Sequence, residues 1–182
     1  MGRSRLVVID ADLPRRLAHR LNERKRDAVS AYDLGLDDLQ DPDLLRELAK
    51  RYNGLRTWVL VTGDDSMPAE HGSVIIETQA TIATLHPKYP PQMTEHHWRV
   101  DLVQRWVHAM QLQAPETVRR YALNGSLPWR PRRRQARQIA HHGWTSWSEV
   151  NAREERRQRA QPADPPGPGE APDTQERFPG LA

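Results

Sequence analysis

Three aspartates stand where the predicted secondary structure changes, and residues of this type at these positions could bind metal ions. Asp10 follows the apolar run 6–9, and Asp64 follows the run 57–62 after one glycine. Asp41 precedes a proline and an apolar pattern of helical period, so it is the predicted N-cap of a helix. Uninterrupted apolar runs are typical of buried parallel strands, whose carboxyl ends form the edge where α/β proteins bind ligands. We therefore expect the three carboxylates to converge at that edge.

The chemistry expected of such a cluster is metal-assisted hydrolysis of phosphodiesters. Close carboxylates repel and raise one another's pKa unless a cation neutralises them. Hard oxygen ligands favour Mg²⁺ or Mn²⁺, which keep several waters and accept phosphate oxygens in the remaining positions. Such a site can activate water and stabilise the charge that develops on the phosphate. The sequence offers no competing serine or cysteine arrangement, and its glycines form neither a P-loop nor a dinucleotide fingerprint.

Strands that alternate with helices are needed to position these acids. Strands are predicted at residues 6–9, 27–31, 57–62 and 73–77, and helices at residues 13–24 and 41–52. Pro14 fixes φ for a first helical turn, and Leu17 and Leu21 follow four residues apart. A simpler role for Asp10 and Asp12 is therefore to cap this helix. The alternation predicts βαβ units and an α/β fold with a mainly parallel sheet of about four strands.

After a proline-rich break at residues 86–91, the apolar period becomes that of a long helix. Every fourth residue from Trp98 is apolar, which predicts one face that packs on the sheet; the residues are Trp98, Leu102, Trp106 and Met110. Arg99 lies outside this stripe, as does Asp101, which is placed to pair with Arg105. Residues 115–123 are predicted to be helical as well, with a stop at Asn124-Gly125. We expect a helical extension over residues 92–160, after a nuclease-like domain at residues 1–91.

The extension is rich in arginine and tryptophan. The candidate RNA-binding side chains are Arg130, Arg132, Arg133, Arg134 and Arg137, with Trp129, Trp144 and Trp147 beside them. They could hold RNA by phosphate contacts and base stacking, form a solvated helix whose tryptophans pack on the domain, or dock an acidic partner protein. The adjacent histidine pairs 96–97 and 141–142 point apart on a helix and are interpreted as surface or packing residues. The Pro- and Gly-rich tail at residues 161–182 is expected to be disordered.

Composition limits the class of protein. The 182 residues include no cysteine, which excludes disulfides and thiolate metal sites and fits a reducing compartment. No stretch approaches the ~18 apolar residues that cross a bilayer, so we expect a soluble, cytoplasmic protein without a membrane partner. The net charge is only +3, but acids cluster before Glu77 and arginines between residues 119 and 159. An acidic centre beside a basic surface suits a polyanionic substrate.

Residues 6–77 resemble the small PIN-like proteins related to the VapC-type toxins of bacterial toxin–antitoxin pairs. The stretches that carry the resemblance are VVIDADLPRRLAHRL, DLGLDDLQDPDLLRELAKR, VLVTGDDSM and GSVIIE. The resemblance implies a PIN-like α/β/α sandwich and a metal-dependent ribonuclease held inactive by a cognate antitoxin. It assigns the catalytic acids to Asp10, Asp41 and Asp64. We expect Asp12 and Asp65 to act as supporting metal ligands. The expected partners are RNA, an antitoxin protein and a second copy of the chain in a homodimer.

The sequence departs from the PIN-like pattern at two acid positions. Ala11 stands where relatives often have an acid after the first aspartate, and Ser66 with Met67 replaces an acid and an aromatic residue. Two hypotheses follow. The first is an Mg²⁺- or Mn²⁺-dependent endoribonuclease that is the toxin of a toxin–antitoxin pair. The alternative is a catalytically inactive PIN-like module that binds RNA or a protein partner through its basic extension.

Overall fold

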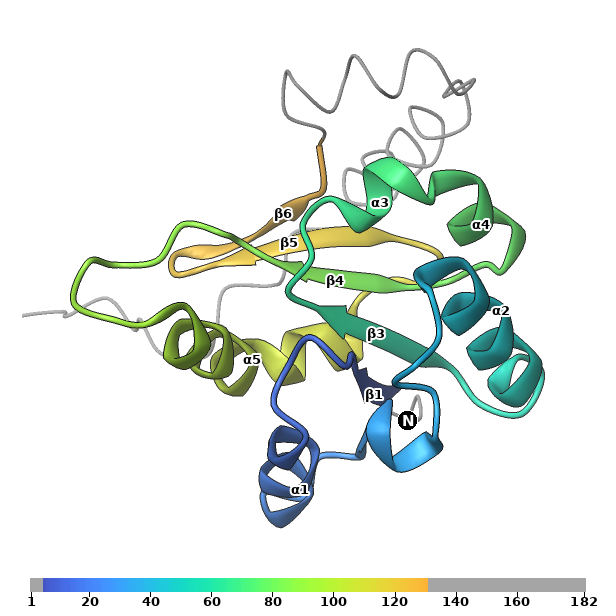
Figure 1. Ribbon diagram of the computed structural model, residues 1–182, viewed down its shortest axis with the longest axis horizontal. Coiled ribbons are helices and arrows are strands. Elements are labelled where there is room, and N and C mark those ends of the chain that lie inside the picture. The colour runs from blue at the N-terminus through green and yellow to red at the C-terminus, as the bar shows by residue number, and fades with distance from the viewer. Residues whose placement is uncertain (1–4, 131–182) are drawn as a thin grey trace, which may run out of the picture.

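Buried apolar strands form the centre of the structure, a computed structural model in which residues 5–130 are described (Figure 1). The strands are, in sheet order, β2 (Ala28–Ser30), β1 (Leu6–Ile9), β3 (Trp58–Thr62), β4 (Ile82–Leu85), β5 (Val118–Ala122) and β6 (Gly125–Pro128). The first five run parallel, and β6 pairs antiparallel with β5. The predicted α/β class with a mainly parallel sheet is therefore confirmed. The predicted number of about four strands is wrong, since the sheet has six.

Helices cover both faces of the sheet. They are α1 (Arg16–Glu23), α2 (Asp41–Tyr52), α3 (Met67–Glu70), α4 (Gly72–Glu77) and α5 (Glu95–Leu112), with a 3₁₀ turn at Tyr32–Leu34. Helices α1 and α5 lie on one face, and α2, α3 and α4 on the other (Figure 1). Val7 and Ile9 pack with the first group, whereas Leu6 and Val8 pack with the second. Successive side chains of strand β1 thus point to opposite faces of the sheet and pack in two different apolar layers. No helix among residues 5–130 has the length and apolar character to cross a membrane.

The strand predicted at residues 73–77 is wrong, because this segment is helix α4. Val74 and Ile75 are buried, while Ile76 and Glu77 face outward, which is a helical pattern of burial and not an alternation. The β-branched residues favoured a strand, but packing against the α2 side of the sheet overrides that propensity. The fourth parallel strand is the next apolar segment, β4, whose four residues are all buried.

The helix predicted at residues 115–123 is also wrong, because this segment contains strand β5. Val118 packs in one apolar layer and Tyr121 in the other, as expected of strand residues an odd number of positions apart. The predicted stop at Asn124-Gly125 lies in the β5–β6 hairpin, where Leu123 and Asn124 form the turn and Gly125 begins β6. Gly125 has φ +143°, a backbone conformation that glycine adopts without strain. The extension expected over residues 92–160 therefore adds two strands to the sheet.

The long helix predicted from its apolar stripe is confirmed as α5. Thr94 caps it by accepting a hydrogen bond from the His97 backbone N–H at 3.3 Å. Its buried side chains include Trp98 and Leu102, and the helix lies over β1, β3 and β4. The predicted pair is present as well, with Arg105 Nη2 3.4 Å from Asp101 Oδ2.

One crossover connection differs in hand from the others. The β1–α1–β2 and β4–α5–β5 units place their helices on the same face but step in opposite directions along the sheet, so their hands are opposite. The connections through α2 and through α3 and α4 use the other face and step away from β2, so they share the hand of the first unit. The β4–α5–β5 connection is thus the one whose hand is opposite to that of the three others. It brings α5 back over β1 and β3.

Candidate active site

The acidic residues gather where the chain leaves β1 and β3 in opposite directions. After β1 the chain turns to α1 on one face, and after β3 it turns to α3 on the other. Neighbouring strands whose connections diverge in this way leave a crevice at their carboxyl ends. The Asp10 backbone N–H donates to the Val61 carbonyl at 3.0 Å and extends the β1–β3 ladder by one residue. The two loops are thus held side by side.

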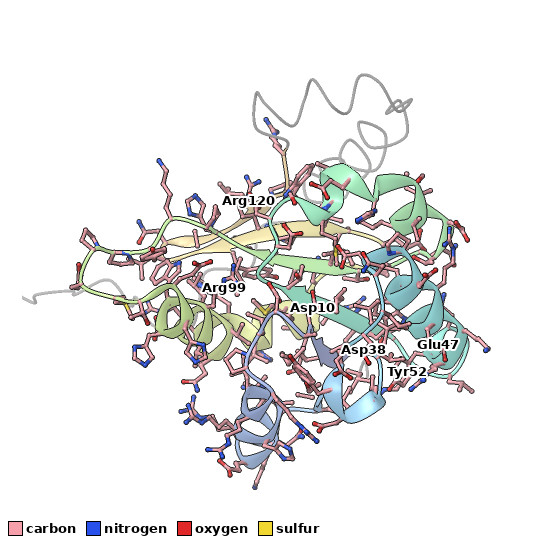
Figure 2. The ribbon with its side chains drawn as sticks, viewed as in Figure 1. Asp10, Asp38, Glu47, Tyr52, Arg99 and Arg120 are labelled. Atoms are coloured by element: carbon pink, nitrogen blue, oxygen red, sulfur yellow. The ribbon has the colours of Figure 1, made fainter. Side chains whose placement is uncertain are left out.

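Asp10 is buried at this edge, at 7% exposure (Figure 2). Burial raises the pKa of its carboxyl group, and the charge of Asp64 raises it further. Hydrogen bonds from the Thr62 side chain and from the Ala11 backbone N–H, the latter at 2.7 Å, partly offset that shift. Thr62 Oγ1 also accepts a hydrogen bond from the Asp64 backbone N–H at 3.0 Å. One threonine therefore joins the two acids predicted from the strand ends.

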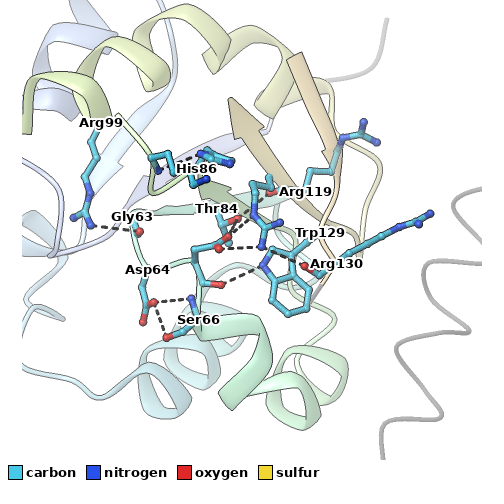
Figure 3. A network of polar contacts seen from close by, with 12 residues as sticks. Gly63, Asp64, Ser66, Thr84, His86, Arg99, Arg119, Trp129 and Arg130 are labelled. Carbon is cyan, nitrogen blue, oxygen red and sulfur yellow. Dashed lines mark hydrogen bonds and ion pairs between the residues drawn. The ribbon is translucent and has the colours of Figure 1, made fainter. Parts of the chain in front are cut away.

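Asp64 is oriented by Ser66, the residue that stands where the PIN-like pattern often has an acid. Asp64 Oδ1 accepts hydrogen bonds from the Ser66 backbone N–H at 2.7 Å and from Ser66 Oγ at 2.8 Å (Figure 3). Within the described part of the chain, Asp64 Oδ2 accepts no hydrogen bond. Ser66 thus fixes this carboxylate and leaves one oxygen for a ligand.

Asp41 reaches the same cluster from the first residue of α2. The predicted N-cap position is one residue out, since Gln40 is the N-cap and Asp41 is the first helical residue. Burial raises the pKa of Asp41, with further contributions from Asp10 and Asp64, while His71 opposes the shift. His71 Nε2 lies 3.5 Å from Asp41 Oδ2. The structure therefore brings the three predicted catalytic acids within electrostatic reach of one another and adds a histidine that the sequence analysis missed.

Asp12 lies at the same edge and has a cationic partner. Its Oδ1 accepts a hydrogen bond from the Gly63 backbone N–H at 3.2 Å, and its Oδ2 lies 3.3 Å from Arg99 Nη1. Burial and the charge of Asp10 raise the pKa of Asp12 to about 6. The hydrogen bond from Gly63 and the charge of Arg99 only partly offset that rise. Arg99 was placed on the outer side of its helix in the sequence analysis, without a role at the site.

Asp65, expected to support the metal, is turned to a different set of partners. Arg120 binds it in a two-point ion pair, with Nε 2.5 Å from Oδ1 and Nη2 2.9 Å from Oδ2. The Thr84 hydroxyl donates to Oδ1 at 3.3 Å, and Trp129 Nε1 donates to the Asp65 carbonyl at 3.2 Å (Figure 3). The Arg120 guanidinium also lies 5.6 Å from the centre of the Trp129 ring. Trp129 is fully buried, so this tryptophan is a packing residue.

The carboxylate oxygens of Asp10, Asp12, Asp41 and Asp64, together called the acidic edge, suit a hard cation. They do not converge on one point. Among residues 5–130, no three Asp, Glu or His side chains are close enough to form a ready-made metal site. Of the candidate RNA-binding arginines, Arg130 is exposed at the end of the described segment. The others lie outside that segment, namely Arg132, Arg133, Arg134 and Arg137.

Comparisons with protein-family models, with curated proteins and with solved structures gave no match for this chain.

The free energy of unfolding of the metal-free protein is expected to fall as the pH rises from about 4 to about 7. The pKa values of Asp10, Asp12 and Asp41 are raised on folding, so the folded chain binds more protons than the unfolded chain in this window. By linkage, stability is then lost as these groups ionise with rising pH. Urea unfolding in EDTA at a series of pH values measures the effect.

The matched control for this pH series is Asp12→Asn. It removes the contribution between the ordinary pKa of 3.8 and about 6, so its pH dependence is expected to be flatter. A free energy of unfolding that rises steadily across the window would contradict the raised pKa values.

Proposed function

We propose that this chain is a PIN-like endoribonuclease that depends on Mg²⁺ or Mn²⁺ and acts as the toxin of a toxin–antitoxin pair. The observation that carries the proposal is the coupling of Asp10 and Asp64 at the ends of neighbouring parallel strands, with Asp41 reaching the same cluster. Mutually repelling carboxylates in a crevice are stable as a group when a cation neutralises them. The order of acids along the chain is the order that the PIN-like resemblance assigns.

The proposed metal ligands are the carboxylates of Asp10, Asp41 and Asp64. Their hard oxygens fit Mg²⁺ or Mn²⁺ in kind, and such ions accept bridging waters where a side chain stays at a distance. When bound, the ion activates water and stabilises negative charge on the phosphate. The residues of the chain itself hold the ligands in place, since Thr62 hydrogen-bonds Asp10 and Ser66 fixes one oxygen of Asp64. Asp65 supplies no ligand in this proposal, because Arg120 occupies both of its carboxylate oxygens.

The proposed substrate is RNA, and charge supports this part of the proposal. Arg119 and Arg130 lie on the β5–β6 side of the sheet, and the sequence continues directly into the arginine-rich residues 131–159. Arginine side chains beside the acidic edge attract a polyanion such as RNA. The carboxylates of the edge repel the same polyanion unless a bound metal ion neutralises them. A cognate antitoxin would have to neutralise the same basic region or cover the acids.

The alternative function is that of an inactive PIN-like module that binds RNA or a protein. Two observations favour it. Asp65 is engaged by Arg120, and a serine replaces the acid expected at position 66. The acidic edge then retains fewer ligands than an active site of this type uses, and the basic residues alone would carry function.

Cleavage of mixed total RNA by the full chain is expected in the presence of Mg²⁺ or Mn²⁺ and is expected to stop when EDTA is added. The physical reason is that the acids repel phosphate until a divalent cation neutralises them. Gel analysis of the RNA over time measures the reaction. RNA that stays intact with either metal, in the presence of folded protein, would support the inactive module instead.

A further inference from the structure

Arg99 of α5 places its guanidinium among the oxygens of the acidic edge. Nη1 lies 3.3 Å from Asp12 Oδ2 and 3.5 Å from the Asp12 carbonyl oxygen. Nη2 lies 2.6 Å from Glu95 Oε1. It also lies 3.5 Å from the Gly63 carbonyl oxygen (Figure 3). The side chain is 23% exposed, so the charge is partly withdrawn from water. One cation therefore connects α5 to the loops that follow β1 and β3.

The close approach of Arg99 depends on the glycine at position 63. A Cβ atom at Gly63 would lie 2.6 Å from both Arg99 Cζ and Asp12 Oδ2, closer than real Cβ atoms come to such neighbours. The absent side chain leaves the space that the guanidinium and the carboxylate fill. Gly63 also donates its backbone N–H to Asp12 Oδ1, so the same residue holds the other oxygen of the pair. The glycine, the acid and the arginine form one packed unit.

The contacts of Arg99 define its function at this edge. A guanidinium stays charged at all physiological pH values, and here its contacts are with oxygens of the chain itself. It is thus engaged by these oxygens and is less suited to bind an incoming phosphate. Its positive charge lies beside the Asp12 carboxylate and opposes the repulsion that Asp12 experiences from the negative charges of Asp10 and Asp64. Removal of Arg99 would leave that repulsion uncompensated.

We propose that Arg99 is a built-in counter-cation of the acidic edge, which neutralises Asp12 and keeps it out of the set of carboxylates that bind the divalent ion. Asp10, Asp41 and Asp64 then form that set. The second half of this inference rests on the proposed metal-dependent function, whereas the pairing of Arg99 with Asp12 does not. Arg99 is a positioning residue in this scheme, since it acts through Asp12.

The pairing is tested without metal by a double-mutant cycle in EDTA. Arg99→Gln is expected to lower the free energy of unfolding, because Asp12 is left among like charges. Asp12→Asn combined with Arg99→Gln is expected to recover much of that loss. The matched control is Arg105→Gln, which removes an exposed pair from the same helix and is expected to have little effect. Additive effects of Arg99→Gln and Asp12→Asn overturn the pairing.

The ligand set is tested by Mn²⁺ binding to the full chain, measured by calorimetry. Arg99→Gln is expected to bind Mn²⁺ about tenfold more tightly, because a positive charge leaves the edge and a carboxylate is released. Arg99→Lys keeps the charge and is expected to stay near the unmodified chain. Gly63→Ala displaces the guanidinium and is expected to follow Arg99→Gln.

Two outcomes overturn the ligand-set inference. Weaker Mn²⁺ binding by Arg99→Gln would mean that Arg99 presents Asp12 as a metal ligand, and unchanged binding would mean that it has no influence on the ion. Absence of Mn²⁺ binding by the unmodified chain and by Arg99→Gln overturns the proposed function together with the ligand set. The cycle in EDTA then still decides separately whether Arg99 neutralises Asp12.

Discussion

Replacement of Asp10 by asparagine is expected to abolish metal-dependent RNA cleavage while the chain remains folded. The asparagine side chain would keep nearly the same shape but lose the charge that holds a divalent cation. The rate is expected to fall by more than about 100-fold, because even groups that only orient a metal ligand affect activity by about 10–100-fold. The measurement is the initial rate of RNA cleavage at saturating Mn²⁺ for the variant and the unmodified chain.

The stability of Asp10→Asn separates loss of chemistry from loss of structure. The buried carboxylate is unfavourable when ionised, since burial and Asp64 both raise its pKa. Its neutral replacement is therefore expected to unfold at the same or a higher urea concentration in EDTA at neutral pH. The matched control is Asp27→Asn, an exposed aspartate directly before β2 and thus at the amino-terminal end of the parallel strands, which should retain full activity. Unimpaired cleavage by Asp10→Asn would refute the proposed site.

Arg120→Met is expected to lower the free energy of unfolding by about 3–5 kcal/mol, because it removes from the buried Asp65 carboxylate the cation that binds both of its oxygens. The two side chains are 16% and 8% exposed, so neither charge is well hydrated. The stacking of Arg120 on Trp129 would be lost at the same time. Urea unfolding at neutral pH, followed by tryptophan fluorescence and by circular dichroism, measures the change.

The double variant Arg120→Met with Asp65→Leu identifies the cause of that loss. Removal of both charges is expected to restore a large part of the stability, since a buried pair replaced by apolar residues is often neutral. Arg105→Met is the control for an exposed pair, with an expected effect of about 0–1 kcal/mol. A double variant as unstable as Arg120→Met alone would show that lost packing, and not removal of the cation from Asp65, causes the loss.

The central strands and their terminal acids could be predicted because both signals are local. The apolar runs that end before Asp10 and Asp64 contain no polar side chain in their buried centres, so they indicate buried parallel strands without knowledge of the rest of the chain. The proline after Asp41 and the apolar pattern behind it indicate a helix start in the same way. These signals place the three acids at one edge of the sheet. The direction in which each carboxylate points is decided by other elements.

The partners of the site could not be predicted because they come from distant segments. Arg99 is 87 positions from Asp12 along the chain, and no pattern within the α5 segment distinguishes it from the neighbouring Arg105. Asp65 binds Arg120, which lies on a strand that the sequence indicated as a helix. The helix at 73–77 was predicted as a strand because its β-branched residues favour one, whereas packing against distant elements decides the structure of this segment.

The position of α5 over strands that precede it by several elements also limits how the chain can be divided. Because α5 lies over β1 and β3, its apolar side chains shield from solvent the face of the sheet that carries Val7, Ile9 and Val61. A fragment that ended at Pro91 would therefore expose several strands of bare apolar surface and an unpaired edge on β4, both of which promote aggregation. The PIN-like resemblance ends at Glu77, but the smallest autonomous unit extends at least to Trp129, which fills the opposite layer. The boundary of sequence resemblance is thus not the boundary of folding.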